Sequence, residues 1–257
     1  MLLTQSRAER MLRDLPGTVG LYCRDLGSGE TVEVNAEAVV EAASVIKLYV
    51  MAEAFRQRAA GELDFARPVT VRPEDRLPSC GALSYLHPGV TLPVGDLVTL
   101  MVILSDNTAT NLLIDLLGQE RIRATIAGLG MRGTALNRKL FMPELAARGI
   151  RNEITAGDCA RLLELLWRGE AVDAESSAEM LRILGDQRLN GKMPFHLHSR
   201  GIRCAHKTGE DDGITHDVGL IHAATPRIFC FVSERTDVPR AERVLQDLAA
   251  LCADVEV

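Results

Sequence analysis

Segments with the pattern of β-strands lie at both ends of this chain, and the stretch between them is helical in pattern. Five runs rich in β-branched and aromatic residues are expected to be strands: 18–26, 30–34, 201–208, 213–223 and 227–234. Gly27-Ser28-Gly29 joins the first two as a hairpin. This placement predicts an α+β fold, an α/β sandwich in which both ends of the chain build one antiparallel sheet and a helical subdomain is inserted between them.

Helical patterns recur along the whole chain. Apolar residues recur at helical spacing in eight segments: 1–14, 44–60, 94–104, 107–117, 120–129, 155–167, 176–184 and 239–252. Residues 68–92 are rich in Pro and Gly and are expected to be mostly irregular. With 257 residues and 47% hydrophobic content, the chain can bury one full core. We therefore expect one domain over 1–257, with 1–40 and 195–257 in its sheet part and 41–194 in its mainly helical part.

The helix expected from Ser44 carries the first chemical signal. Ser44 and Lys47 are three residues apart, so both would lie on one face of its first turn. A lysine that is partly buried in an apolar face can accept the proton of the serine, and the helix N-terminus favours negative charge that develops there. A serine and a lysine at this spacing are also common on solvated helices, so the pair needs further support.

Two tripeptides supply that support. Ser105-Asp106-Asn107 follows the apolar run 97–104, and Lys207-Thr208-Gly209 closes the run that begins at Gly201. S-x-x-K, S-D-N and K-T-G in this order are the motif set of class A β-lactamases and penicillin-binding proteins. Over nearly its whole length, the chain therefore resembles the class A β-lactamase type of serine hydrolase. The resemblance implies a β-lactamase/transpeptidase-like fold and an acyl-serine intermediate.

The resemblance also implies roles for the reacting groups. Ser44 would attack a carbonyl carbon, and Lys47 would accept its proton. Ser105 would relay a proton to the leaving nitrogen, although it could instead cap the helix that follows. Asp106 would point inward and hold the loop in place.

Substrate-binding residues follow from the same resemblance. Asn107 would hydrogen-bond the amide of the substrate and Lys47. Lys207 and Thr208 would bind a carboxylate from the edge of a strand, and Gly209 would also belong to the substrate-binding residues. The backbone N–H of Glu210 would complete an oxyanion hole with that of the nucleophile.

The sequence departs from the family pattern where class A β-lactamases carry the glutamate that activates water for deacylation. The corresponding stretch is 138–146, Arg-Lys-Leu-Phe-Met-Pro-Glu-Leu-Ala. Alignment on Pro143 places Met142 at the position of the base, and alignment on Arg138 places Leu140 there. Neither side chain can activate water, so we expect acylation to be followed by slow deacylation.

Glu144 is the carboxylate within reach of that position and is the candidate base, with a solvated loop glutamate as the alternative. Arg138 is expected to close the loop by pairing with Glu153 or with the side chain of Asn152.

Composition excludes several classes of partner. The net charge is −6, and no cluster of Lys and Arg with interleaved aromatic residues occurs, which argues against nucleic acid. No apolar run approaches the roughly eighteen residues of a membrane span. The histidines lack the spacing of a zinc site, so we expect no metal and no cofactor.

The six cysteines have no C-x-x-C spacing and are expected to be free thiols. The resemblance places a frequent disulfide of the family at Met51 and Val98, where this chain has no cysteine. Residues 1–14 are amphipathic and lack the continuous apolar core of a secretion signal. Both features predict a cytoplasmic protein, or a secreted or periplasmic one if a leader has been removed.

Three functions are compatible with these residues. The first is a serine hydrolase that β-lactams acylate and from which the acyl group leaves slowly. The second is a peptidase, amidase or esterase for another small amide or ester, again with a carboxylate on the substrate. The third is a binding protein that uses the same cleft without catalysis, which would have no need for a nucleophile together with two proton-handling residues.

Overall fold

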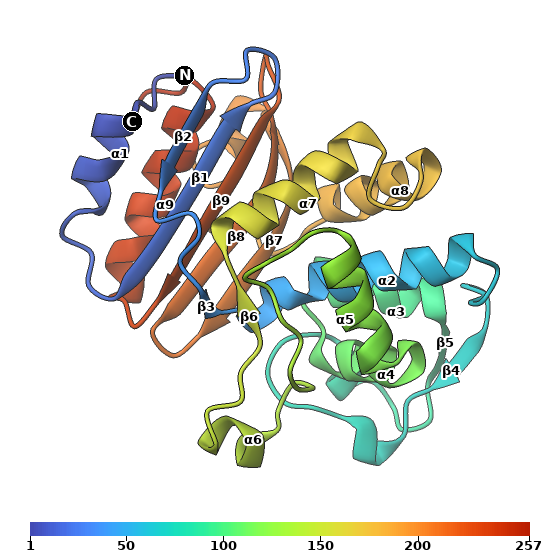
Figure 1. Ribbon diagram of the computed structural model, residues 1–257. Coiled ribbons are helices and arrows are strands. Elements are labelled where there is room, and N and C mark those ends of the chain that lie inside the picture. Colours follow the sequence, from blue (N-terminus) through green and yellow to red (C-terminus); the bar gives the residue numbers. More distant parts are fainter.

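The computed structural model covers residues 1–257 and has the predicted α+β architecture, with a five-stranded antiparallel sheet beside a helical region (Figure 1). The strand order is β2-β1-β9-β8-β7. The strands are β1 (Thr18–Asp25), β2 (Thr31–Val34), β7 (Arg203–Asp211), β8 (Ile214–His222) and β9 (Arg227–Glu234). The first and last parts of the chain meet between β1 and β9, where Thr18 lies opposite Glu234 and Asp25 opposite Arg227. The prediction of one sheet from both ends of the chain is thus confirmed.

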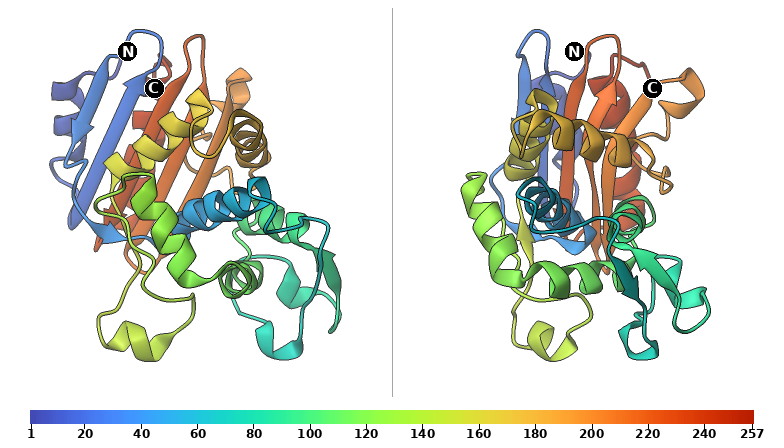
Figure 2. Two further views of the ribbon diagram at one scale, coloured as in Figure 1. Left: turned by 45° about the vertical axis from the view of Figure 1, so that its right-hand side comes forward. Right: turned by 90° about the vertical axis from the view of Figure 1, so that its right-hand side faces the viewer.

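Helices cover both faces of this sheet (Figures 1 and 2). The amphipathic helices α1 (Gln5–Leu12) and α9 (Val238–Cys252) pack on one face and bury a core of their own with it. On the other face, α7 (Ala156–Arg168) packs across β1, β8 and β9, and α8 (Ala174–Gly185) packs beside β7. A second core runs from this face into the helical region, so the two regions share their apolar interior.

The helical region surrounds one buried helix, α2 (Lys47–Ala59). Every residue of α2 from Lys47 to Phe55 is buried, which explains why residues 48–52 are all apolar. Its neighbours are α3 (Val94–Ile103), α4 (Asn107–Leu117) and α5 (Gln119–Gly128), close to the predicted bounds. The first turn differs from the prediction, because residues 43–46 form a 3₁₀ helix, η1 (Ala43–Ile46), before α2 begins.

Several short elements were not predicted. β3 (Val40–Glu41) pairs with β6 (Glu153–Ile154), and β4 (Pro68–Thr70) pairs with β5 (Thr91–Pro93) at the two ends of the irregular segment. The remaining ones are single turns of helix: η2 (Pro73–Asp75), η3 (Leu83–Tyr85), α6 (Pro143–Ala147) and η4 (His198–Arg200). They are too short for a periodic signal, because each spans no more than about one to one and a half turns.

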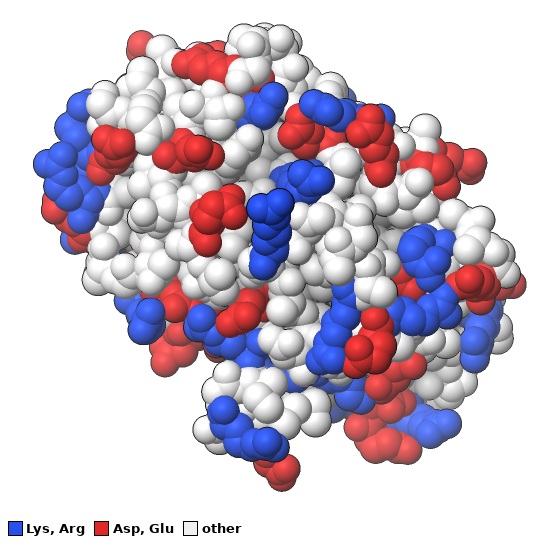
Figure 3. Space-filling model, viewed as in Figure 1, with Lys and Arg blue, Asp and Glu red and all other residues white.

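All six cysteines are free thiols, and Met51 and Val98 are both buried apolar side chains of the shared core. None of the helices combines the length and apolar character needed to cross a bilayer. Acidic and basic side chains are interspersed over the face seen in Figure 3, apart from a local cluster of basic side chains over α1.

Candidate active site

Ser44 lies on η1, immediately after a residue with unusual backbone geometry. Ala43 has φ +41°, in the left-handed region that alanine rarely adopts, and such strain is typical of functional sites. The side chain of Ser44 is half-buried, and its hydroxyl makes no hydrogen bond with another protein group. The hydroxyl is therefore free to meet a substrate.

Strand β7 lies directly beside η1. A Cβ atom on Gly209 would come within 3.2 Å of Val45 Cγ2 and 2.7 Å of His216 Cδ2, so only glycine lets the strand approach this closely. The approach brings Glu210 to the same cavity as Ser44. The K-T-G motif and the nucleophile are thus neighbours, as predicted.

Lys47 is completely buried one turn after Ser44. Its Nζ donates to Ser105 O at 2.7 Å and to Asn107 Oδ1 at 2.8 Å, and it lies 3.0 Å from Ser105 Oγ. Burial, followed by the nearby charge of Lys207, lowers the pKa of Lys47 well below its usual range. The neutral form of this amine, which can accept a proton, is therefore favoured relative to that of an exposed lysine.

Lys207 reaches Ser105 from the side of the sheet. Its Nζ lies 3.1 Å from Ser105 Oγ and donates to Thr208 O at 2.8 Å. Burial lowers the pKa of Lys207 to about 7, although the charge of Asp217 acts in the opposite direction. Ser105 Oγ thus lies between two amines, and a hydroxyl can donate its proton to one of them while it accepts from the other.

The turn that presents Ser105 is held by Asp106. Ser105 has φ +54°, and the carboxylate of Asp106 caps α4 by accepting from Ala109 N at 2.9 Å. Its second oxygen accepts from Ala82 N at 2.7 Å and Leu83 N at 2.9 Å. The inward, loop-holding role predicted for Asp106 is confirmed, whereas the N-cap of α4 is Asp106 and not Ser105.

A cavity of about 560 Å³ opens in front of these groups. Of the predicted site residues, Ser44, Asn107 and Glu210 line it, while Lys47, Ser105, Lys207 and Thr208 are buried behind its surface. The other lining residues are Glu41, Ala43, Ser79, Cys80, Arg138, Leu140, Phe141, Met142, Pro143, Ala146, Asn152 and Asp211. The three motifs therefore meet at one cavity.

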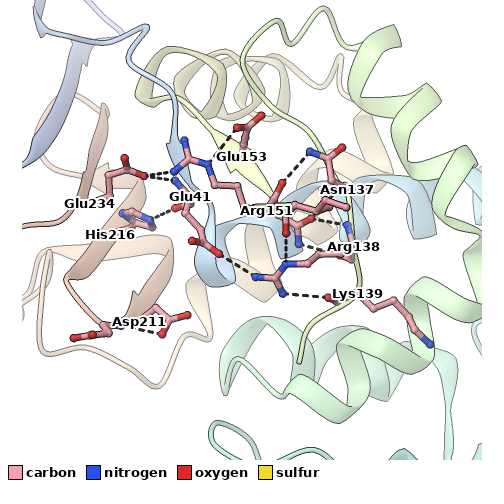
Figure 4. A network of polar contacts seen from close by, with 12 residues as sticks. Glu41, Asn137, Arg138, Lys139, Arg151, Glu153, Asp211, His216 and Glu234 are labelled. Atoms are coloured by element: carbon pink, nitrogen blue, oxygen red, sulfur yellow. Dashed lines mark hydrogen bonds and ion pairs between the residues drawn. The ribbon is translucent and has the colours of Figure 1, made fainter. Parts of the chain in front are cut away.

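The loop from 138 to 152 closes in part as predicted, because Arg138 contacts the side chain of Asn152 but not Glu153. Arg138 Nη2 pairs with Glu41 Oε1 at 3.0 Å, not with Glu153, which pairs with Arg151 at 3.3 Å (Figure 4). Asn152 does take part, because its Oδ1 accepts from the backbone N–H of Arg138 at 3.0 Å. Nothing in the sequence around Glu41 singled it out, since its partner lies 97 residues away.

Glu144 lies away from the reacting groups. It is exposed near the start of α6, forms no ion pair or side-chain hydrogen bond, and does not line the cavity. Leu140 and Met142 do line it. Two of the acidic side chains in the cavity are committed elsewhere, because Glu41 pairs with Arg138 and Glu210 pairs with Lys192 at 3.0 Å.

His216, on β8, connects the sheet to the segment before the nucleophile. Ser233 N donates to Nδ1 at 3.1 Å, so the ring proton is on Nε2, which donates to Glu41 O at 2.9 Å (Figure 4). Burial lowers the pKa of His216 to about 4, so the ring is neutral at physiological pH. This residue holds the chain three positions before Ser44, a role that no local pattern in the sequence indicates.

Comparison with known proteins decides the family. The model of the "Beta-lactamase enzyme family" matches residues 3–255. The chain belongs to this family. A solved β-lactamase from Sphaerobacter thermophilus is 32% identical, with 97% of this chain and 96% of that chain covered and a TM-score of 0.89. The structure of PBP-A is 27% identical, with 97% and 94% covered and a TM-score of 0.88.

A second PBP-A structure, of a point mutant, is described as an acyl-enzyme complex with penicillin G. It is 26% identical to this chain, covers 97% of this chain and 94% of its own, and has a TM-score of 0.87. Membership of the β-lactamase family agrees with the meeting of S-x-x-K, S-D-N and K-T-G at one cavity. The chain is thus a class A β-lactamase-like serine enzyme.

Proposed function

We propose that this protein is a serine hydrolase in which β-lactams acylate Ser44 and the acyl group leaves slowly. The observation that carries the proposal is the placement of Ser105 Oγ between Lys47 Nζ and Lys207 Nζ, behind the cavity that Ser44 lines. A serine nucleophile with two buried amines and a connecting hydroxyl can both lose and return a proton.

Acylation proceeds in three proton transfers. Ser44 Oγ attacks the carbonyl carbon while its proton passes to the neutral amine of Lys47, and the N–H groups of Ser44 and Glu210 stabilise the oxyanion. The bond from the carbonyl carbon to the leaving nitrogen then breaks, and Ser105 gives that nitrogen a proton. Lys47 or Lys207 returns a proton to Ser105. Catalytic hydrogen bonds often tighten only when substrate binds. The absence of a hydrogen bond to the Ser44 hydroxyl in the unliganded protein is therefore compatible with this mechanism.

Substrate binding uses the middle of β7. The ammonium of Lys207 and the hydroxyl of Thr208 favour a carboxylate on the leaving-group side, and Asn107 offers its amide to the acyl amide. These residues would make the substrate a small β-lactam, or another acyl amide or ester with a carboxylate.

Slow deacylation follows from the loop. The acyl-enzyme needs a base that deprotonates water beside the acyl carbon, but Leu140 and Met142 occupy the aligned positions and Glu144 does not line the cavity. An amidase or esterase that acts on a different acyl donor would share the acylation chemistry and would differ in having an acyl group that leaves quickly.

Intact-protein mass spectrometry after mixing with penicillin G or a chromogenic cephalosporin tests the proposal. We expect the mass to rise by one whole penicillin molecule, because the ring opens without loss of atoms, and to fall back slowly. Ser44→Ala should show no adduct. An adduct that persists in Ser44→Ala, or rapid turnover with no detectable adduct, would contradict the proposal.

A further inference from the structure

One wall of the cavity presents apolar side chains to water. This wall, which we call the apolar wall, consists of Leu140, Phe141, Met142, Pro143 and Ala146. Phe141 and Met142 are 45% and 37% exposed. Exposed apolar groups gathered beside a nucleophile are typical of a ligand site, because an apolar ligand group removes them from water.

The apolar wall is attached to the body of the protein through Asn111 of α4. Asn111 Oδ1 accepts from Leu140 N at 2.9 Å, and Asn111 Nδ2 donates to Leu140 O at 2.9 Å. The side chain of Leu140 also packs against the shared core. These contacts therefore fix the position of Leu140, the first residue of the apolar wall.

The position of the cavity along β7 shows which half of a substrate it receives. Glu210 and Asp211 line the cavity, whereas Lys207 and Thr208, earlier in the strand, do not. With about 3.3 Å per strand residue, Asp211 lies roughly 13 Å beyond Lys207. A substrate with its carboxylate at Lys207 and its carbonyl at Ser44 would extend its acyl group toward Asp211 and the apolar wall.

The charges around the cavity disfavour an anionic acyl group. Arg138 is the one Lys or Arg among the lining residues, and its guanidinium is already paired with Glu41 at 3.0 Å. Asp211 lines the cavity and forms no ion pair. An incoming carboxylate would therefore meet an unpaired negative charge and no free cation.

We infer that the cavity accepts acyl donors whose acyl group is bulky, apolar and uncharged, such as an arylacetyl group, and disfavours acyl groups that carry a carboxylate. The inference rests on the proposed acylation of Ser44 and names its substrate class. The apolar part of the acyl group would lie on Phe141 and Met142.

Three penicillins that share one nucleus test this preference. Penicillin G carries a phenylacetyl group on its 6-amino nitrogen, and carbenicillin adds a carboxylate to that group. In 6-aminopenicillanic acid this nitrogen carries no acyl group. The second-order rate constant for acylation of Ser44, divided by the rate constant of hydroxide hydrolysis, should be at least tenfold higher for penicillin G than for either of the others.

A matched pair of variants tests whether the preference depends on Phe141 of the apolar wall. Phe141 has φ +56°, a region that asparagine tolerates, so Phe141→Asn removes the ring without demanding a new backbone. Phe195 is 55% exposed and does not line the cavity, so Phe195→Asn is the control. We expect Phe141→Asn to lower the penicillin G rate at least fivefold and to leave the 6-aminopenicillanic acid rate within twofold, with Phe195→Asn unchanged for both.

The outcomes separate this inference from the function on which it rests. Equal corrected rates for the three penicillins, or equal losses for both substrates in Phe141→Asn, would overturn the inference while acylation itself stands. If no penicillin acylates Ser44, the β-lactam form of the proposed function fails. The comparison then uses p-nitrophenyl acetate and p-nitrophenyl phenylacetate, where a corrected ratio below ten overturns the inference.

Discussion

Lys47 and Lys207 approach one atom from opposite sides of the cleft, with their Nζ atoms 3.0 and 3.1 Å from Ser105 Oγ. Burial disfavours the charged form of both amines, and the charge of Lys207 further disfavours that of Lys47. The hydroxyl can accept from a charged Lys207 while it donates to a neutral Lys47. We take this to be the reactive arrangement, and the pH dependence of acylation follows from it.

Acylation should slow as the pH rises through about 7. A neutral Lys47 and a charged Lys207 are both needed, and the pKa of Lys207 is lowered to about 7, so the rate should fall up to about tenfold per pH unit above that value. Stopped-flow acylation between pH 5 and 9.5 measures this decline. A flat profile would contradict the role of Lys207.

Unfolding cannot account for that decline, because the sign of the stability change is opposite. Between pH 7 and about 10 the unfolded chain binds the proton of Lys207 and the folded chain does not, so this residue makes the free energy of unfolding rise with pH. Thermal unfolding over the same pH range is the control.

Lys207→Ala should separate two kinds of substrate. The lost ammonium matters most where there is an anion to bind, and a charge-assisted hydrogen bond contributes about 1.5–3 kcal/mol, so acylation by carboxylate-bearing substrates should fall roughly 10- to 150-fold. Neutral esters should lose less. Acylation rates for a penicillin and for p-nitrophenyl phenylacetate decide the matter, and equal losses would assign the side chain to support of the fold.

His216 should make the protein sensitive to acid. Its folded pKa is about 4 against about 6.5 in an unfolded chain, so stability is complete above pH 6.5 and declines as the pH falls toward 4. The difference of about 2.5 units corresponds to about 3 kcal/mol. His216→Gln can keep both hydrogen bonds without titrating, so its unfolding free energy should change less between pH 6.5 and 4. An identical pH dependence in both proteins would contradict this role.

The parts of the site that local spacing governs could be predicted from the sequence. The helical spacing of Ser44 and Lys47 holds, although the serine lies on η1 and not on α2, because the strained turn at Ala43 leaves no periodic signal. The meeting of Ser105 with Lys207, which are 102 residues apart, was foreseen only from the family motifs. The strand pattern likewise predicted the sheet, because β1, β7, β8 and β9 each have the residue types of a buried strand.

The path of the loop could not be predicted, because it depends on contacts between distant segments. Arg138 pairs with Glu41, a residue from the other side of the cleft, and His216 holds the backbone of that same residue from β8 (Figure 4). Neither contact has a local pattern. Of the two partners predicted for Arg138, Asn152 contacts its backbone, whereas Glu153 pairs with Arg151.

A carboxylate placed on the loop should restore the missing half-reaction. Leu140 and Met142 both line the cavity, but Leu140 is anchored through Asn111 and is less exposed, so Leu140→Glu should hold a water more firmly than Met142→Glu. General-base help contributes a factor of about 10² to 10⁴, and deacylation of the penicillin G adduct in Leu140→Glu should rise within that range while acylation changes little. The decay of the adduct by mass spectrometry measures the first rate and stopped-flow mixing the second.

Glu144→Gln is the matched control, because Glu144 is exposed outside the cavity, so both rates should stay within about twofold of the wild type. Accumulation of adduct in Glu144→Gln would instead show that α6 moves its carboxylate to the acyl carbon during turnover.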